Sequence, residues 1–458
     1  MLIFHKLFYN NFMKKIKPPA VAGSFYSENE LELKNQLKKF EKNSLNSYKY
    51  KSKAVIVPHA GLVYSGQLAY DGLKTLKANL TTLFIFAPAH RKSFDGLSLS
   101  DYDFWQTPLG NIEINQKINF ELEQNFNCKF FNQAFETEHA IEIQLPIIQT
   151  LYKNAKIVPI LVGNADFEVI SQIINHYYKN ETIGFIISSD LSHFLNAKES
   201  SKVDNITANM LETGDFTGFH YQQACGALGI LGLASFANSK KYSLIRIGLI
   251  NSSNTTGDTS SVVGYGSWFL YENSKNEFLK KYYSDTIIKI CRNAISEKIE
   301  SKNTNLPKTP SVFEEKGACF VTLEKSGQLR GCIGSIIATC PLIKDLIKNA
   351  QNAALNDNRF NPVTKEELNK ISIAVSLLSE PEKIEFKNET ELLSQIVPFK
   401  DGIIIKDGSY QAVYLPSVWE QIPDKIDFLM SLKIKAGLPI DYFSKTFESY
   451  RFGVEYIK

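Results

Sequence analysis

From Ala54 onward, the first part of the chain alternates short, β-rich apolar runs with longer amphipathic stretches, and this alternation constrains the fold more than any other feature. The runs that have the length and composition of strands are Ala54 to Val57, Leu83 to Ala87, Lys156 to Val162, Gly184 to Ser188 and Ile245 to Ile250. Strands separated by helical segments are typical of a mostly parallel sheet covered by helices. We therefore predict an α/β fold with α/β/α layering for this part.

Polar residues that include histidine follow three of these runs. They are Pro58-His59, Pro88-Ala89-His90 and Ser189-Asp190-Leu191-Ser192-His193. Ligands of open α/β sheets bind at the carboxyl ends of strands, so we expect these side chains to lie near one another. A first-row metal ion needs imidazole or thiolate groups that converge from separate elements, and strand-end histidines can supply that geometry.

Each of these histidines, taken alone, is more often a structural residue than a ligand, and we assign His5, His176 and His220 to the structural class. The repeated strand-end context is what favours function for the others. His139 begins an amphipathic segment between acidic residues. A carboxylate beside a ligating histidine can accept its second ring N–H, for which the candidates are Asp190, Glu138 and Glu142. A solvated surface or a helix cap is the alternative role for these carboxylates.

A domain boundary is predicted in the polar stretch from Tyr271 to Glu277. All 7 histidines precede it, so imidazole chemistry belongs to the first part. The second part opens with a helical pattern from Glu277 to Lys302 and continues with shorter strands, which indicates a smaller α+β domain. Those strands are Ala318 to Leu323, Ile371 to Leu378, Gly402 to Ile405 and Gln411 to Leu415. The predicted organisation is a first domain at 14–271, a linker at 272–277 and a second domain at 278–458.

Composition argues against several classes of protein. The formal net charge is only +3, which disfavours a chain that mainly neutralises nucleic acid or lies on an anionic membrane. Its longest apolar runs are far shorter than the ~18 residues of a membrane span. The 6 cysteines form no Cys-x-x-Cys pair, so we expect a reduced, cytoplasmic setting. The opening residues lack the pattern of a secretory signal, and translation could start at Met1 or at Met13.

One motif of the second part, Gln328-Leu329-Arg330-Gly331-Cys332-Ile333-Gly334, places a cation and a thiol between glycines. An exposed or groove-lining turn of this composition could hold an anion or present a reactive thiol, which makes Arg330 and Cys332 candidate site residues. The alternative is a β-hairpin with a buried Cys332 and a surface Arg330, and the residues alone favour it.

Several segments between about residue 16 and residue 271 strongly resemble the Memo family. They are Pro19 to Tyr26, Pro58 to Gly66, Pro88 to His90, Glu138 to Glu142, Ser189 to His193 and Ala224 to Gly226. That family is similar in fold to the class III extradiol dioxygenases (a LigB-like fold), whose iron is held by two histidines and a glutamate, with a further histidine as acid or base.

The resemblance implies a metal pocket made of His59, His90 and Cys225, with His193, Asp190 and His139 lining it as catalytic candidates. A thiol stands where the dioxygenases have a carboxylate, so ring-cleaving activity cannot be carried over from the fold. We expect one divalent or redox metal ion, with iron favoured and copper or zinc as alternatives.

The second part resembles the AMMECR domain over about 278–458. The matching segments are Gln328 to Gly334, Asp357 to Pro362, Leu415 to Gln421 and Lys435 to Pro439. Proteins of the two families occur together in microbes with a radical-SAM protein, as the AmmeMemoRadiSam set, and this chain looks like its B and A components fused. The resemblance therefore implies a radical-SAM partner.

Two functions compete at this point. The first is a metal-dependent redox or dioxygenase-like enzyme that acts on an unknown small molecule together with the radical-SAM partner. The second is a non-catalytic metal-binding or scaffold protein for that partner. A nucleic-acid partner is not expected, because the charge is balanced and no aromatic-basic platform is visible.

Overall fold

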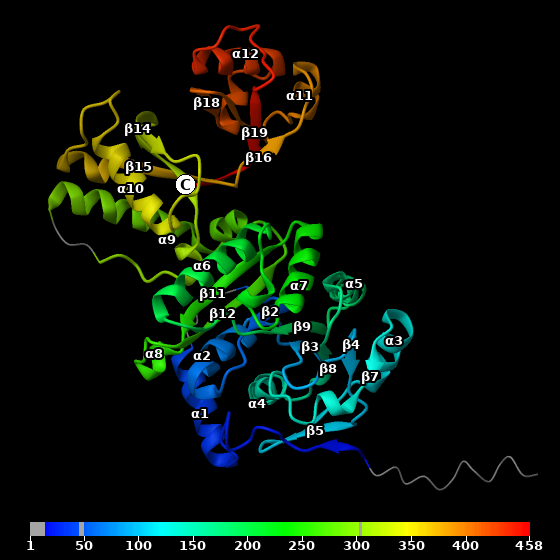
Figure 1. Cartoon of the computed structure of the whole chain (residues 1–458). Coiled ribbons are helices and arrows are strands. Elements are labelled where there is room, and N and C mark those ends of the chain that lie inside the picture. The colour runs from blue at the N-terminus through cyan, green and yellow to red at the C-terminus, as the bar shows by residue number, and fades with distance from the viewer. Residues whose placement is uncertain (1–13, 45–49, 302–304) are drawn as a thin grey trace, which may run out of the picture. The chain divides into compact units, whose positions relative to one another are not determined.

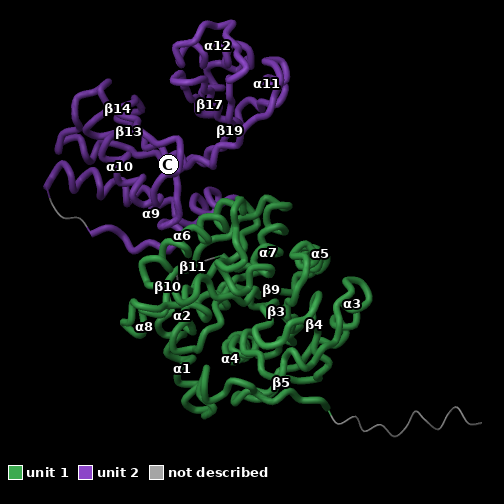
Figure 2. Tube along the Cα trace, in the orientation of Figure 1, with its two compact units in different colours: residues 1–273 green, residues 274–458 purple. Residues whose placement is uncertain are grey.

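The structure, a computed structural model, describes residues 14–44, 50–301 and 305–458. The two candidate start positions, Met1 and Met13, and the histidine His5 lie outside the described residues. The chain divides into two compact units, residues 1–273 and 274–458 (Figure 2). The fold class predicted from the sequence is confirmed, since each unit combines helices with β-sheets (Figure 1).

Four neighbouring parallel strands form the centre of the large sheet in the first unit. In sheet order they are β2 (Ala54–Val57), β9 (Ile183–Ser188), β3 (Thr82–Pro88) and β8 (Lys156–Val162). These buried strands are nearly continuous apolar runs, as expected for parallel strands that are covered on both faces. Their carboxyl ends meet at one edge of the sheet.

Antiparallel pairs flank this parallel centre. β12 (Val262–Tyr271) runs antiparallel to β2, to β11 (Ser243–Asn251) and to β10 (His193–Leu195). On the other side, β4 (Leu97–Leu99) is antiparallel to β8 and parallel to β7 (Lys129–Phe130). The strand expected at Ile245 to Ile250 is therefore present as β11, but it is antiparallel to its neighbour. A separate small sheet holds β1 (Ile16–Lys17), β5 (Phe104–Thr107) and β6 (Gly110–Glu113).

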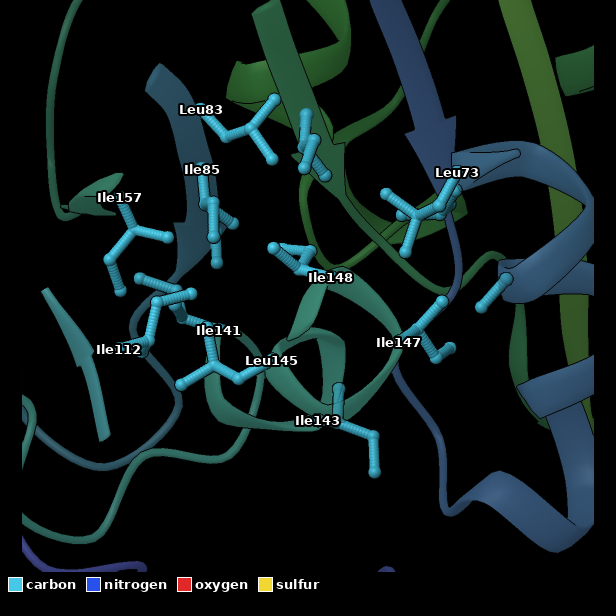
Figure 3. Packing of buried hydrophobic residues seen from close by; sticks show 14 of the residues in the cluster. Leu73, Leu83, Ile85, Ile112, Ile141, Ile143, Leu145, Ile147, Ile148 and Ile157 are labelled. Atoms are coloured by element: carbon cyan, nitrogen blue, oxygen red, sulfur yellow. The ribbon is translucent and has the colours of Figure 1, made fainter. Parts of the chain in front are cut away.

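Helices cover both faces of the large sheet, because alternate residues of its strands point to opposite sides. Val55 and Val57 of β2 belong to one apolar core, whereas Ala54 and Ile56 belong to the other. The first core contains residues of α1 (Glu30–Asn43), α2 (Leu62–Leu73) and α4 (Leu145–Leu151). The second contains residues of α3 (Gln116–Phe126), α5 (Phe167–Tyr177), α6 (Ala197–Thr213) and α7 (Ala227–Lys240). Figure 3 shows the first core, in which leucines and isoleucines of α4 lie against Leu83 and Ile85 of β3.

Short helical segments complete the first unit. They are η1 (Asn132–Ala134), η2 (Glu142–Gln144), η3 (Tyr221–Gln223) and α8 (Ser253–Thr256).

Two four-stranded sheets make up the strands of the second unit. The first has the order β14 (Gln328–Gly334), β13 (Ala318–Lys325), β15 (Ile371–Leu378) and β20 (Val454–Ile457). The second has the order β16 (Glu382–Ile384), β19 (Glu448–Phe452), β17 (Gly402–Asp407) and β18 (Tyr410–Tyr414). The helices of this unit are α9 (Lys275–Glu300), η4 (Ser311–Glu314), α10 (Leu342–Leu355), η5 (Lys365–Lys370), α11 (Glu389–Gln395), η6 (Pro416–Glu420) and α12 (Lys425–Ala436).

The long helix α9 begins two residues earlier than predicted. The Ser274 hydroxyl accepts the amide N–H of Glu277 at 3.2 Å, which caps a first turn that starts at Lys275. Part of the predicted linker at 272–277 is therefore helical. Its predicted end, Lys302, lies outside the described residues. Among the described helices, none combines the length and the apolar character that a bilayer crossing requires.

Candidate metal centre

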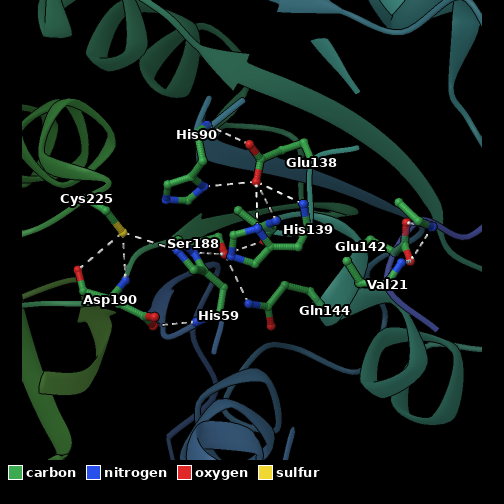
Figure 4. Close-up of polar contacts among 12 residues, drawn as sticks. Val21, His59, His90, Glu138, His139, Glu142, Gln144, Ser188, Asp190 and Cys225 are labelled. Carbon is green, nitrogen blue, oxygen red and sulfur yellow. Dashed lines mark hydrogen bonds and ion pairs between the residues drawn. The ribbon is translucent and has the colours of Figure 1, made fainter. Parts of the chain in front are cut away.

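His59, His90 and Cys225 reach one place from three elements of the first unit (Figure 4). His59 follows β2 and is only 1% exposed, and His90 follows β3. Cys225 precedes Gly226, the residue that caps α7. Their potential ligand atoms lie within 4.8 Å of one another, and His59 Nε2 is 3.2 Å from Cys225 Sγ. Bonds of about 2.0–2.3 Å to a shared ion can span such separations, so this donor set fits one metal ion.

Ser188, the last residue of β9, fixes the tautomer of His59. Its hydroxyl donates to the carbonyl oxygen of Ala140 at 2.7 Å and accepts the Gln144 side-chain amide at 3.1 Å. It lies 3.0 Å from His59 Nδ1. Because its single proton is already donated, Ser188 accepts the Nδ1–H of His59, which leaves Nε2 without a proton and facing Cys225.

Glu138 fixes the tautomer of His90 in the same way. Its carboxylate accepts from His90 Nδ1 at 2.9 Å and from the His90 amide at 2.6 Å, so the second nitrogen of the ring is free to bind a metal. The carboxylate also accepts the amides of His139 and Ala140. Although burial alone would raise the pKa of Glu138, hydrogen bonds from His139 and His90 hold it well below its usual range. Glu138 is thus a carboxylate that orients a histidine, as its position in the sequence predicted.

Polar groups surround the thiol of Cys225. The amide of Asp190 donates to its sulfur at 3.3 Å, and the hydroxyl of Ser189 is 3.9 Å away. Desolvation, and then the charge of Asp190, raise the pKa of the Cys225 thiol well above its usual value. Without an ion the sulfur therefore keeps its proton, and metal binding must release that proton.

The described hydrogen bond of the Asp190 carboxylate goes to a backbone amide and not to an imidazole ring. The carboxylate accepts the backbone amide of His59 at 2.7 Å, which holds the end of β2 in place. Burial raises the pKa of Asp190 to about 7, against the lowering effect of the amides of His59 and Ala60.

His139 lies beside His90 at the same site. The ring of His139 stacks on His90 with centroids 4.8 Å apart and also contacts Phe25. Together, His90, Glu138 and His139 form a second group whose ligand atoms lie within 4.8 Å of one another. His193 begins β10 and lies near enough to His59 and His90 for their charges to interact. Burial lowers the pKa of His193, which favours a neutral imidazole at neutral pH.

Glu142 differs from its predicted role. Its buried carboxylate accepts from Lys17 Nζ at 2.9 Å, from the Tyr26 hydroxyl at 2.8 Å and from the amides of Ala20 and Val21. It therefore fixes the segment before α1 and contacts no histidine among these partners.

The remaining described histidines have structural contacts. His176 of α5 packs edge-on against Phe126 and Tyr177, and His220 caps η3. Sequence reasoning missed the roles of Ser188 and Gln144. The one signal for Ser188 is its position at the carboxyl end of a predicted strand.

In the second unit, Arg330 and Cys332 lie on strand β14 and not in a turn. The turn is formed by Ser326 and Gly327, both with positive φ, so the following residues are free to pair with β13. Leu329 and Gly331 pair with consecutive residues of β13, which leaves Arg330 as the extra residue of a β-bulge.

Both candidates of the second unit are held by salt-bridged side chains. The guanidinium of Arg330 donates to Glu367 at 2.9 Å. The amide of Cys332 donates to Asp357 at 2.8 Å, and Arg359 donates to the Cys332 carbonyl at 3.2 Å.

Comparisons with known proteins agree with this architecture. The family description "Memo-like protein" matches residues 17–269, and the description "AMMECR1" matches residues 288–457. A MEMO1 family protein of Aquifex aeolicus is 30% identical over 262 residues, which cover 55% of this chain and 97% of that protein.

Two further relatives are similar to parts of the chain. A protein of Methanothermobacter thermautotrophicus is 44% identical over 161 residues, which cover 34% of this chain and 84% of that protein. A solved structure of an uncharacterised protein from Pyrococcus horikoshii is 35% identical, covers 38% of this chain and 89% of that one, and gives a TM-score of 0.36. The family match over more than half of the chain, together with the strand-end histidines, shows that this chain belongs to the Memo-like protein family and carries an AMMECR1 domain after it.

Proposed function

We propose that the first unit holds one metal ion through His59, His90 and Cys225 and uses it in redox or dioxygenase-like chemistry on a small molecule. The observation that carries this proposal is the convergence of the three ligand atoms within 4.8 Å. The hydrogen bonds of Ser188 and Glu138 support it, because they leave one nitrogen of each imidazole free for an ion.

The donor set bears on which metal binds. Two imidazoles and one thiolate form a softer set than two imidazoles and a carboxylate, and they suit iron, copper(I) or zinc. Iron is our first candidate. Three protein ligands leave a coordination position open, and an ion bound there would polarise or exchange electrons with a small molecule.

The chain itself contributes acid-base and positioning groups. Because its pKa is lowered, the His193 imidazole is neutral at neutral pH and can accept a proton from a bound molecule. Asp190 holds the backbone of His59, and Glu138 holds His90. We assign the acid-base role to His193 and a supporting role to His139.

The AMMECR1 domain is proposed to bind the substrate or a radical-SAM partner. Its presence in the same chain supports a shared pathway, because fusion supplies both domains in equal amounts. Co-purification of the full chain with a co-expressed radical-SAM protein, compared with a chain cut after residue 273, tests this part of the proposal.

Metal analysis of protein purified without oxygen tests the metal site. We expect about one ion per chain, and loss of most of it in Cys225→Ser and His90→Ala, because three protein ligands are the minimum of a stable open site. His176→Ala is the matched control, since His176 lies on α5 among aromatic rings. His193→Gln should keep the metal but lose activity. Metal retained without turnover of any substrate would favour the non-catalytic, metal-holding function.

Cys225→Glu sharpens the choice of metal. This variant would have two histidines and one carboxylate, the ligand set of non-haem iron(II) sites, so its affinity for iron(II) relative to copper(I) and zinc should rise above that of the parent chain. An unchanged preference would mean that Cys225 does not bind the ion.

A further inference from the structure

A pocket of about 470 Å³ borders the candidate metal centre on the side of Cys225. It lies beyond the carboxyl ends of β3 and β8, beside the first turn of α7. Its volume falls within the ~300–1,000 Å³ of typical small-molecule sites. Because Cys225 and Ser188 form part of its wall, a molecule in this pocket would lie next to the metal ligands.

Glycines fix two walls of this pocket. A Cβ at Gly226 would lie 2.8 Å from the carbonyl oxygen of Ser188, and one at Gly163 would lie 2.2 Å from that of Phe94. Only glycine therefore allows α7 to start so close to β9, and only glycine allows the loop after β8 to touch the loop after β3. Such close backbone contacts give a pocket that is formed before any ligand arrives.

The lining of the pocket carries a net positive charge. Among the described residues that form the wall, Lys92 is the one charged side chain. The cap of α7, Gly226, has no side chain to accept the first amides of the helix, so the positive end of the helix dipole adds to the effect of Lys92. The carboxylate of Asp95 lies nearby but accepts the side-chain amide of Asn164 at 3.1 Å.

Most of the remaining wall is apolar or aromatic. It includes Phe86, Pro88, Phe94, Val162, Tyr221 and Leu228. Tyr221 is 63% exposed, so a molecule in the pocket could cover apolar surface that water contacts in the free protein.

We propose that this pocket binds a small molecule with an apolar body and a single carboxylate, and holds it beside Cys225. The carboxylate would pair with Lys92, while the body would pack against Phe94, Leu228 and Tyr221. This inference rests on the proposed function for the role of the metal, but binding itself requires only the protein walls.

Benzoate, benzamide and acetate are suitable probes, since they separate the anionic group from the apolar body. Titrations of the full chain followed by ligand-observed NMR, with and without metal, should show benzoate binding more tightly than either of the other two. Lys92→Met should lower the affinity for benzoate about fivefold, which is the effect expected from the loss of a partly exposed ion pair. The affinity for benzamide should not change.

Three variants control this experiment. Lys92→Arg should restore benzoate binding, and Lys179→Met, at an exposed lysine elsewhere on the first unit, should have no effect. Ser93→Trp, at the exposed rim, should block both aromatic probes.

The outcomes separate this inference from the metal proposal. Lys92-dependent binding of benzoate to a chain that takes up no metal would uphold the pocket and refute the metal proposal. Equal binding of benzoate and benzamide, benzoate binding that Lys92→Met leaves unchanged, or no binding at all would overturn the inference while leaving the metal proposal standing.

Discussion

Cys225 of the first unit and Cys332 of the second both lie next to a glycine in a motif shared with a protein family, yet their surroundings differ. Around Cys225 the contacts converge on the sulfur, from His59 Nε2 at 3.2 Å and the Asp190 amide at 3.3 Å. Around Cys332, Asp357 and Arg359 hold the main-chain N–H and C=O, and the sulfur lies 3.3 Å from the hydroxyl of Thr322 on the neighbouring strand, with no imidazole beside it among these contacts. The first arrangement suits a ligand to an ion, whereas the second seals the edge of a sheet.

The charges of the two regions differ in the same way. In the second unit, Arg330 of the motif pairs with Glu367, and Arg359, which contacts the motif at Cys332, pairs with Asp357, so both cations already have an anion. In the first unit, the histidines keep one nitrogen each turned towards the shared site. A motif of reactive residue types thus indicates a binding site only where its side chains remain available.

Among the variants that test this comparison, Gly331→Ala should have the largest effect on stability. A Cβ at this position would lie 2.1 Å from the backbone carbonyl oxygen of Ala353 in α10, so β14 and α10 would have to separate. We expect the free energy of unfolding of the second unit to fall by about 3 kcal/mol or more, and metal binding to be unchanged. Chemical denaturation followed by circular dichroism, together with metal analysis, checks both parts.

Gly327→Ala is the control for that variant. Gly327 has a φ of +77° but no neighbour within 4 Å of an added Cβ, so the cost should be only about 1 kcal/mol. Equal effects of the two variants would mean that Gly331 does not pack against α10 as described.

Glu138→Gln should weaken metal binding about 10- to 100-fold, the usual range for loss of a carboxylate that orients a ligand. The Glu138 carboxylate now accepts hydrogen bonds from the backbone amide and from Nδ1 of His90. In the variant, the NH₂ group of the glutamine side chain would face one of these N–H donors, and that hydrogen bond would be lost. Competition with a chelator measures the affinity. Glu136→Gln, at an exposed position of the same loop, should leave it unchanged. If both variants bind metal like the parent chain, Glu138 does not orient a ligand.

Glu367→Gln should destabilise the second unit by about 1 kcal/mol at pH 6, through its hydrogen bonds from Arg330 and Lys325. Those bonds lower the pKa of Glu367 from 4.5 to about 2. A lowered folded pKa means that the stabilisation is complete above about pH 4.5 and disappears as the pH falls towards 2. Denaturation of both proteins at pH 6 and pH 3 should therefore show a smaller difference at pH 3; a difference independent of pH would contradict the ion pair.

Phe194→Gly should have the smallest effect, a gain of about 0.5–1 kcal/mol in stability. Phe194 has a φ of +59°, is 79% exposed and is the extra residue of a bulge in β10 beside His193. Ser326→Gly, at φ +53° in the hairpin of the second unit, is the matched change. Thermal melts measure both. A loss of stability in Phe194→Gly alone would show that the phenyl ring makes a stabilising contact there.

The centre of the fold could be predicted because buried parallel strands are continuous apolar runs. Lys156–Val162 was predicted with the bounds that the parallel strand β8 has, and the apolar run Ile371–Leu378 was predicted with the bounds of β15, which lies in an antiparallel sheet. The direction of β11 could not be predicted, because it depends on pairing with β12, a strand that the chain reaches only after α8. Strand β19, with charged and aromatic residues mixed, is stabilised by β16 and β17 on its two sides and not by its own pattern.

The candidate site was partly visible in the sequence for the same reason. Strand ends place His59 and His90 at one edge of the sheet, and the family resemblance added Cys225. The role of Ser188 depends on Ala140 and Gln144, which lie more than 40 residues away in sequence, and no local pattern encodes that convergence. The bulge at Arg330 likewise arises from its register with β13.

X-ray absorption spectroscopy of the metal-loaded full chain tests the central claim most directly. A site made of His59, His90 and Cys225 predicts one sulfur at about 2.3 Å and two imidazole nitrogens at about 2.0–2.1 Å from the ion, with the sulfur lost in Cys225→Ser. A spectrum with only nitrogen and oxygen neighbours, such as His90, Glu138 and His139 would give, would contradict the account.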